Sequence, residues 1–354
     1  MAIVYAEYDI NQILSCCTYV ITSIVFTIEY CSFCVQSKNI RMLLEYVKRD
    51  WNDMQGNEVE SSILGKCMDV GRQYTIFCTS IFVTRIDRSA VTLSIIIFTM
   101  VYIQPLILDV VVPLNESRQP ELTIPISTFN QNNFNFMFIY LIMIVTFGSC
   151  TLITVETIFI VFLRHCCGLL KVTSYKIARS LDWDDNQVSN RQKRTVICLR
   201  IIDTVNMHRR ALAFLVVLVN TFKIRYMFLL FFGVASLIFS LFHTFKVLVI
   251  MHNASQFLLI STITVPNLFM MAFLNYSVQN IIDFNSDICV QTYSVKWYAA
   301  PVSIQKLYLF LMLKTTKNVK IVIGLFAPSM EGLAKLLNIT FSFIMVLCSS
   351  RMAT

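Results

Sequence analysis

The sequence predicts an all-α membrane protein, a polytopic bundle of spanning helices with cytosolic helical extensions. Hydrophobic residues make up 56% of the 354-residue chain and charged residues only 14%, and the mean hydropathy is +0.66. A soluble domain carries about 45–50% apolar and about 25% charged residues. With only 8 Gly and 7 Pro, the chain is also not a linker-rich or disordered protein. These observations favour helices that cross a lipid bilayer.

Six apolar runs are long enough to span, because a bilayer core takes about 20 apolar residues per helix. In chain order they cover residues 13–35, 91–112, 135–163, 226–250, 257–274 and 321–347. A further apolar stretch, 74–83, is short and is followed by Arg85, Asp87 and Arg88. We interpret it as a helix that approaches the membrane boundary from the inside.

Basic residues between the runs predict the orientation of the chain. Segments 38–72, 164–210 and 280–320 contain six, ten and five Lys and Arg residues, whereas 113–134 contains only Arg118 and 251–256 contains none. Loops rich in Lys and Arg remain in the cytosol. The three basic segments are therefore expected inside and the C-terminus outside.

Two N-glycosylation sequons agree with this orientation. Asn115-Glu-Ser and Asn253-Ala-Ser both fall in the charge-poor loops that are expected outside. Each sequon alone is weak support, because such triplets are common by chance. We expect Asn115 and Asn253 to be glycosylated.

Composition also excludes several classes of function. No H-E-x-x-H, G-x-S-x-G, P-loop or Rossmann fingerprint occurs, and the four His are dispersed, so we expect no enzyme. The 12 Cys are scattered through apolar stretches, as small buried side chains are, so we expect neither a metal site nor a cofactor. The formal charge of +8 comes from basic residues in loops, which argues against a nucleic-acid partner.

Four motifs in a fixed order resemble the insect odorant receptor family, and most of all the receptors of ants, bees and wasps. They are PLNESRQP, then RHCCGLLKVTSYKI, then NMHRRALAF, and finally TYSVKWYAAPVSIQKLYLFLMLKTTKNVKIVIGLFAPSMEGLA. The resemblance extends over residues 39–351. It implies seven spans, a cytosolic N-terminus and an extracellular C-terminus.

The resemblance also implies a function. It predicts an odorant-binding tuning subunit of a ligand-gated, non-selective cation channel in the plasma membrane of olfactory sensory neuron dendrites. The expected partners are the odorant receptor co-receptor in a hetero-tetramer, a small volatile organic ligand and the lipid bilayer. In the family, the segment KNIRMLLEYVKRDW follows the second span, and here it follows the first run. We therefore expect six of the seven spans, with the family's first span absent.

We expect a division into three functional parts. Residues 1–274 form the odorant-binding helix bundle with its intracellular extensions, and the helical segments 40–51 and 195–214 are expected to join the cytosolic anchor. Residues 275–320 form a cytosolic anchor, packed around a tetramer axis or lying as a basic amphipathic helix at the membrane interface. Residues 321–354 contain the pore-lining last span and the extracellular tail, with a hinge or simple bend at Gly324 and Pro328.

The last span contains the predicted pore residues. Glu331 and Lys335 are spaced i, i+4 and can form an ion pair, either against a neighbouring helix or in a wetted inner vestibule. Near the outer end, the resemblance places a hydrophobic gate at Val346, together with Phe343 and Met345. Such a ring closes a pore by dewetting. Without the resemblance, Val346 would be interpreted as an ordinary lipid-facing residue.

Apolar side chains in the outer half of the bundle are the predicted odorant pocket, since volatile odorants need a mostly aromatic and aliphatic site. At such positions, a residue of this type is more often a plain core or lipid-facing residue than a pocket residue. The candidates are Phe98, Tyr102, Leu106, Phe138, Met143, Phe147, Leu241, Phe242 and Thr262.

Other membrane-protein classes fit less well. A G-protein-coupled receptor needs an intracellular C-terminus and an N-P-x-x-Y motif, which is absent. A transporter predicts an internal repeat, which the sequence does not show. A gustatory receptor is a close variant, and the PLNES and HCCGLL motifs favour the odorant branch.

Overall fold

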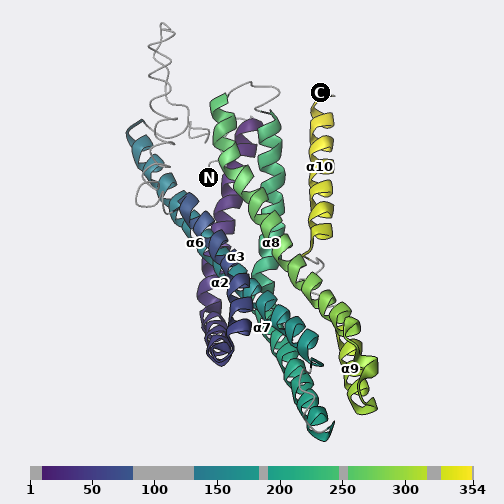
Figure 1. Cartoon of the computed structure of the whole chain (residues 1–354). Helices are drawn as coiled ribbons and strands as arrows, with labels where there is room; N and C mark the ends of the chain where they lie inside the picture. Colours follow the sequence, from purple (N-terminus) through teal and green to yellow (C-terminus); the bar gives the residue numbers. More distant parts are fainter. Residues whose placement is uncertain (1–9, 83–130, 183–189, 247–253, 317–327, 353–354) are drawn as a thin grey trace.

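The fold is a bundle of long helices, seen in a computed structural model that describes residues 10–82, 131–182, 190–246, 254–316 and 328–352. Within these residues it has seven α-helices, one short 3₁₀ helix and no strand, which confirms the predicted all-α class (Figure 1). In chain order the elements are α2 (Ile10–Met54), α3 (Glu58–Phe82), α6 (Gln131–Arg179), α7 (Asn190–Lys246), α8 (Ala254–Ser294), η3 (Trp297–Ala299), α9 (Val302–Thr315) and α10 (Met330–Met352).

The helices are longer than the spans predicted from the sequence. For example, α2 joins the predicted run 13–35 and the predicted helical segment 40–51 in one helix of 45 residues, and α7 extends over 57 residues. The predicted spans end where charged residues begin, because only the apolar part of a helix can cross the lipid. Backbone hydrogen bonds of a helix are internal, so the helix itself continues into water.

The turn between α2 and α3 is encoded by a short polar signal. The side-chain oxygen of Asn57 accepts hydrogen bonds from the backbone N–H groups of Val59 and Glu60 at 3.2 and 3.4 Å. The Glu60 side chain in turn accepts one from Asn57 Nδ2 at 2.8 Å. This arrangement resembles a capping box and starts α3 immediately after α2 ends.

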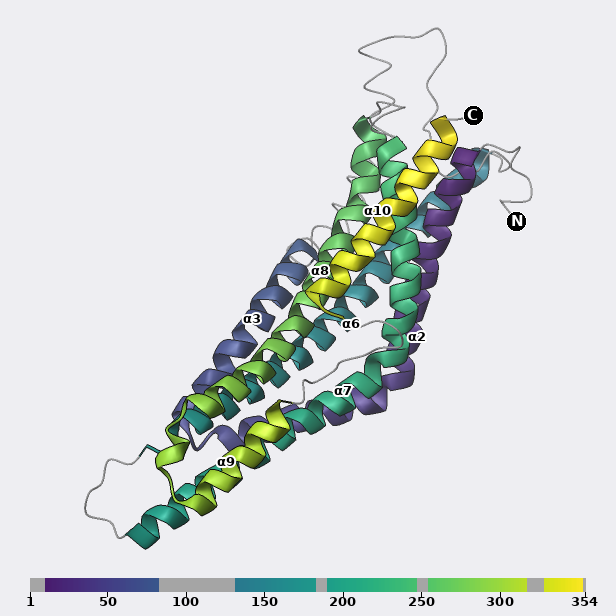
Figure 2. The same cartoon turned by 90° about the vertical axis from the view of Figure 1, so that its right-hand side faces the viewer.

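The central helix of the bundle is α6. In its most apolar window 67% of the residues are buried, against 11% for α2 and 22% for α7. Around it α2, α3, α7 and α8 pack side by side (Figure 2). The main core lies in the half of the bundle where α2 ends and α3 begins, and it includes Leu43, Leu64, Phe162, Leu169 and Leu218.

Close helix contact is possible at two glycines of α6. A methyl group at Gly168 would lie 2.5 Å from Leu64 Cδ1 of α3, and one at Gly148 would overlap the Phe26 ring of α2. Both α2 and α3 therefore pack directly on the α6 backbone at these positions.

The chain turns sharply between α8 and α9. Pro301 lies at the N-cap of α9, and the side-chain amide of Gln305 donates hydrogen bonds to the carbonyl groups of Tyr298 and Ala300, each at 2.8 Å. These bonds hold α9 at the end of the bundle opposite to α10 (Figure 1). The last helix, α10, begins two residues after Pro328 and is capped by Ser329 Oγ, which accepts from Gly332 N at 3.0 Å. Gly324 lies outside the described residues.

Both ends of the described chain lie at the same end of the bundle. The start of α2 and the end of α10 are close to one end, whereas α9 and the start of α7 are at the other (Figure 2). Among the described residues, three helices are long and apolar enough to cross a membrane, namely Val20–Met54, Cys150–Arg179 and Arg191–Phe245. The predicted run 91–112 lies outside the described residues.

Candidate functional site

The last helix exposes most of its apolar side chains in the single chain. All three predicted gate residues are exposed by more than half of their surface: Phe343 by 55%, Met345 by 69% and Val346 by 63%. On the same helix Ile344 is buried against the bundle. One face of α10 thus packs on α7 and α8, and the other requires lipid, water or a second subunit.

The predicted pair on α10 is present. Lys335 Nζ donates to Glu331 Oε1 at 2.6 Å, with both side chains exposed. In the single chain neither side chain is covered by another helix, so the bond is an intrahelical pair facing outward.

The predicted odorant-pocket residues are only partly described. Phe98, Tyr102 and Leu106 lie outside the described residues, as do the sequon residues Asn115 and Asn253. Phe138 on α6 and Thr262 on α8 are helical, but their side chains are outside the described set.

Among the remaining candidates, only Phe242 of α7 is buried, at 4% exposure. Leu241 beside it is half-buried, and Met143 and Phe147 on α6 are exposed. The pocket assignment stays a prediction, because these four side chains do not enclose a cavity by themselves.

A groove of about 420 Å³ extends along α2 and was not predicted. Its described lining consists of Val20, Ser23, Ile24, Thr27 and Ile28. These positions follow the spacing i, i+3, i+4, i+7, i+8 of one helix face, so the sequence did contain a signal for them. The groove is apolar apart from two hydroxyl groups, and its volume is within the range of small-molecule sites.

A buried ion cluster connects three helices below this groove. Arg225 of α7 donates two hydrogen bonds to Glu29 of α2, Nε to Oε2 at 2.8 Å and Nη2 to Oε1 at 2.9 Å. Its Nη2 also donates to Oε1 of Glu156 on α6 at 2.5 Å. All three residues are less than 5% exposed. Because charged groups are stabilised inside a membrane only when paired, this cluster fixes α2, α6 and α7 relative to one another.

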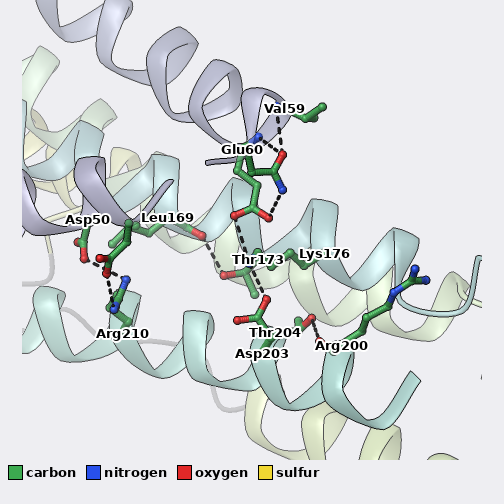
Figure 3. A network of polar contacts seen from close by, with 12 residues as sticks. Asp50, Val59, Glu60, Leu169, Thr173, Lys176, Arg200, Asp203, Thr204 and Arg210 are labelled. Carbon is green, nitrogen blue, oxygen red and sulfur yellow. Dashed lines mark hydrogen bonds and ion pairs between the residues drawn. The ribbon is translucent and has the colours of Figure 1, made fainter. Parts of the chain in front are cut away.

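A second polar network lies nearer to the end of the bundle where α3 begins (Figure 3). Lys176 of α6 bridges Glu60 of α3 at 3.1 Å and Asp203 of α7 at 2.6 Å. The buried Asp50 of α2 contacts His165 Nε2 at 3.0 Å and Arg210 Nη1 at 3.4 Å. The sequence marked these segments as basic but did not identify their partners, because the pairs join residues far apart in the chain.

The predicted anchor region packs α9 on the ends of α6 and α7. Tyr308 of α9 is buried and its hydroxyl contacts Ser180 Oγ, while Arg194 of α7 donates to Ser303 Oγ at 2.7 Å. Burial raises the pKa of the Tyr308 phenol, which therefore remains neutral at physiological pH. The outward face of this region exposes apolar side chains, namely Leu199, Val290, Tyr293, Leu309, Phe310 and Leu313.

Residues 9–341 match the family model described as 7tm Odorant receptor. The chain belongs to the odorant receptor family. The matched range covers nearly the whole chain, which confirms the resemblance seen in the four sequence motifs. No curated protein matches the chain significantly.

Solved structures of insect olfactory receptors share this fold. Olfactory receptor OR5 from Machilis hrabei aligns with a TM-score of 0.66 and 14% identity, over 96% of this chain and 82% of the other. The structure of the same receptor in complex with eugenol aligns with a TM-score of 0.67 and 15% identity, over 99% of this chain and 84% of the other. The chain is therefore a multi-pass membrane protein with the insect olfactory receptor fold.

Proposed function

We propose that this odorant receptor is the odorant-binding tuning subunit of a ligand-gated, non-selective cation channel that acts with the odorant receptor co-receptor. The observation that carries the proposal is the family match over residues 9–341. The exposed apolar face of α10 supports it, because a pore-lining helix must leave one face uncovered in the isolated subunit.

We propose a small, apolar odorant as the ligand. One of the structural relatives, olfactory receptor OR5 from Machilis hrabei, has been solved in complex with eugenol, a small and mostly apolar compound. In this chain the groove on α2 and the predicted candidates on α6 and α7 offer apolar surface with few polar groups. Ligand binding would favour the conformation that opens the pore only if the open form binds the ligand more tightly.

The proposed gate is the exposed ring position Val346, with Phe343 and Met345 beside it. A narrow apolar constriction excludes water and therefore ions, even when it is not sterically closed. Opening would then require that copies of α10 separate at their outer ends. The exposed pair Glu331–Lys335 would lie in the inner vestibule.

We propose that the basic end of the bundle faces the cytosol, with the end of α10 outside. The ends of α6 and α7 around Lys176, Arg194 and Arg200 agree with the positive-inside rule. The plasma membrane of sensory dendrites is the proposed location.

Whole-cell current tests the function directly. The receptor is expressed with and without the co-receptor, and currents are recorded across an odorant panel. We expect an odorant-evoked cation current only when both subunits are present, and we expect it to persist when G proteins are blocked. A response that needs G proteins and ignores the co-receptor would overturn the proposal in favour of a G-protein-coupled receptor.

A substitution tests the gate in the same cells. Val346→Ser should increase the current without odorant, because a hydroxyl group lets water into the constriction. Val216→Ser on α7 is the matched control, since Val216 is similarly exposed at 58% but belongs to a helix that is not proposed to carry the gate. Equal basal currents for the two variants would show that Val346 is not part of the gate.

A further inference from the structure

Arg164 of α6 is a buried cation without an anionic partner. The residue is 6% exposed, and its Nε and Nη2 atoms make no hydrogen bond. Among the described residues no carboxylate lies within ion-pair distance of it, in contrast to Arg225 with its two glutamates. Leaving a guanidinium buried and uncompensated is strongly unfavourable. The side chain can therefore accept a negatively charged group that the described part of the chain does not supply.

Close packing by α3 fixes the stem of the Arg164 side chain, whereas the α8 side of its guanidinium group is covered by a half-exposed tyrosine. A methyl group at Gly71 of α3 would lie 3.4 Å from Arg164 Cγ, so α3 packs closely on the arginine stem. The guanidinium lies 6.0 Å from the Phe273 ring centre and 5.8 Å from that of Tyr276, both on α8. Phe273 stacks on Tyr74 at 3.9 Å. Tyr276 is 49% exposed, so its rotation would give an anion access to the guanidinium.

The position of this site along the bundle corresponds to the depth of lipid phosphates. Arg164 directly follows the apolar run 135–163, and Tyr276 lies two residues after the run 257–274. Tyrosine side chains are enriched at this boundary between hydrocarbon and water. The site thus lies at the membrane interface on the basic end of the bundle.

A second cation continues the site toward water. Lys171 lies seven residues after Arg164, two helical turns and about 10 Å further along the same face of α6. It is exposed, and its Nζ lies 4.6 Å from the Phe284 ring centre of α8. Burial raises the pKa of the Cys67 thiol of α3, and the nearby charges of Lys171 and Arg164 oppose that rise, in agreement with a position of both cations on the α3 side of α6.

We propose that Arg164 and Lys171 bind the headgroup of a phosphoinositide lipid between α3, α6 and α8. The forked guanidinium suits the phosphodiester near the hydrocarbon boundary, and the ammonium group suits a phosphomonoester that extends further into water. Basic pockets between spanning helices on the cytoplasmic side bind such headgroups. This lipid would hold α3 and α8 together on α6.

Thermal unfolding of the purified full chain in neutral detergent tests the site. The probes are dioctanoyl phosphatidylinositol bisphosphate, dioctanoyl phosphatidylserine, dioctanoyl phosphatidylcholine, the soluble inositol trisphosphate headgroup and inorganic phosphate. At a concentration near 100 times Kd, a lipid that binds only the folded chain should raise Tm by about 4 °C. We expect this rise with the phosphoinositide, a smaller rise with phosphatidylserine and none with phosphatidylcholine.

Variants separate binding from a structural role. Arg164→Met should unfold at a higher temperature than the natural chain without lipid, since it removes an unpaired buried charge, and it should lose the lipid-dependent rise. Lys171→Met is exposed and should fold normally. It should weaken phosphoinositide binding by about tenfold or more and leave the phosphatidylserine response unchanged. Arg209→Met, which removes an exposed arginine on α7, is the control and should respond like the natural chain.

Each opposite outcome overturns the proposal. An unchanged lipid response in Arg164→Met would place the lipid elsewhere. If Arg164→Met did not fold, a full phosphoinositide response in Lys171→Met would exclude the site by itself. An equal rise with inorganic phosphate or inositol trisphosphate would identify a site for free phosphate, and an equal rise with phosphatidylcholine would show that charge is not recognised.

Discussion

Helices α6 and α10 are both rich in apolar residues, but they differ in how many of these residues the bundle buries. On α6, Phe162, Leu163 and Leu169 are at most 2% exposed, and the buried Glu156 is paired with Arg225 of another helix. On α10, Phe341, Phe343 and Val346 are exposed by more than half, and the ion pair is formed within the helix itself.

The difference shows which helix the chain stabilises alone and which needs its surroundings. Residues 162–170 of α6 are all buried within one subunit, so their side chains are constrained by neighbours that are already present. The apolar surface of α10 has to be covered by lipid or by another subunit, since exposed patches of this kind mark interaction surfaces. Substitutions on α6 should therefore reduce stability, and those on α10 should alter function with little effect on folding.

We expect the largest loss of stability when the buried ion cluster is disrupted. Arg225→Met leaves Glu29 and Glu156 buried without a counter-charge, and we expect a loss of about 3–5 kcal/mol in the free energy of unfolding. The triple variant with Glu29→Gln and Glu156→Gln should recover most of this loss. Thermal unfolding in detergent and surface expression measure both. A small effect of the single variant would show that the cluster is accessible to water.

A smaller loss is expected at the contact between α3 and α6. Gly168→Ala places a methyl group 2.5 Å from Leu64 Cδ1, and Leu64 is fully buried. Overpacking of this kind destabilises by about 1–3 kcal/mol. Gly233→Ala is the matched control, because nothing lies within 4 Å of its added methyl group. That variant should be neutral or slightly stabilising, and equal melting temperatures for the two would contradict the close packing.

Loss of the bridge at Lys176 should have a still smaller effect. Lys176→Met removes charged hydrogen bonds to Glu60 and Asp203 and should reduce stability by about 1–2 kcal/mol. The Lys176 and Glu60 side chains are 14% and 12% exposed, so salt should screen their bond only weakly. Unfolding at low and high ionic strength checks this, and a stability loss that disappears in salt would argue against a partly buried pair.

On α10 we expect no change in stability. Glu331→Gln breaks an exposed intrahelical pair, so the melting temperature should stay the same. If the pair faces the ion path, the same variant should change single-channel conductance in cells with the co-receptor. A lower melting temperature with unchanged conductance would instead indicate that the Glu331–Lys335 pair packs against a neighbouring helix and does not face the ion path.

The sequence predicted the all-α class and the family. These depend on composition and on local motifs, which one chain displays directly. It did not predict that α2 and α7 continue well beyond the lipid, since charge marks the end of a span but not of a helix. It also missed the burial of Arg164 and the partners of Lys176 and Arg225, because these depend on how distant helices meet.

The candidate site, like the fold, was only partly predictable from the sequence. The i, i+4 pair of Glu331 and Lys335 followed from helical spacing alone, and the structure contains it. The residues that line the α2 groove also follow helical spacing. Because Ser23 and Thr27 interrupt the apolar stripe, the sequence did not indicate a binding groove at this position. Pocket candidates such as Phe242 and Phe147 differ in burial although both are aromatic residues in apolar runs, and only their neighbours decide that.

The pairing of Glu29 with Arg225 has a consequence for how the protein is made. The two residues are 196 positions apart in the chain. At about 5–20 residues per second, the ribosome needs about 10–40 s to synthesise the segment between them. During that time the acidic side chain of α2 has no cation to meet in the bilayer, where isolated charges are poorly tolerated. Retention of the nascent α2 by the translocation machinery or by a membrane chaperone until α7 emerges would protect this side chain from the lipid.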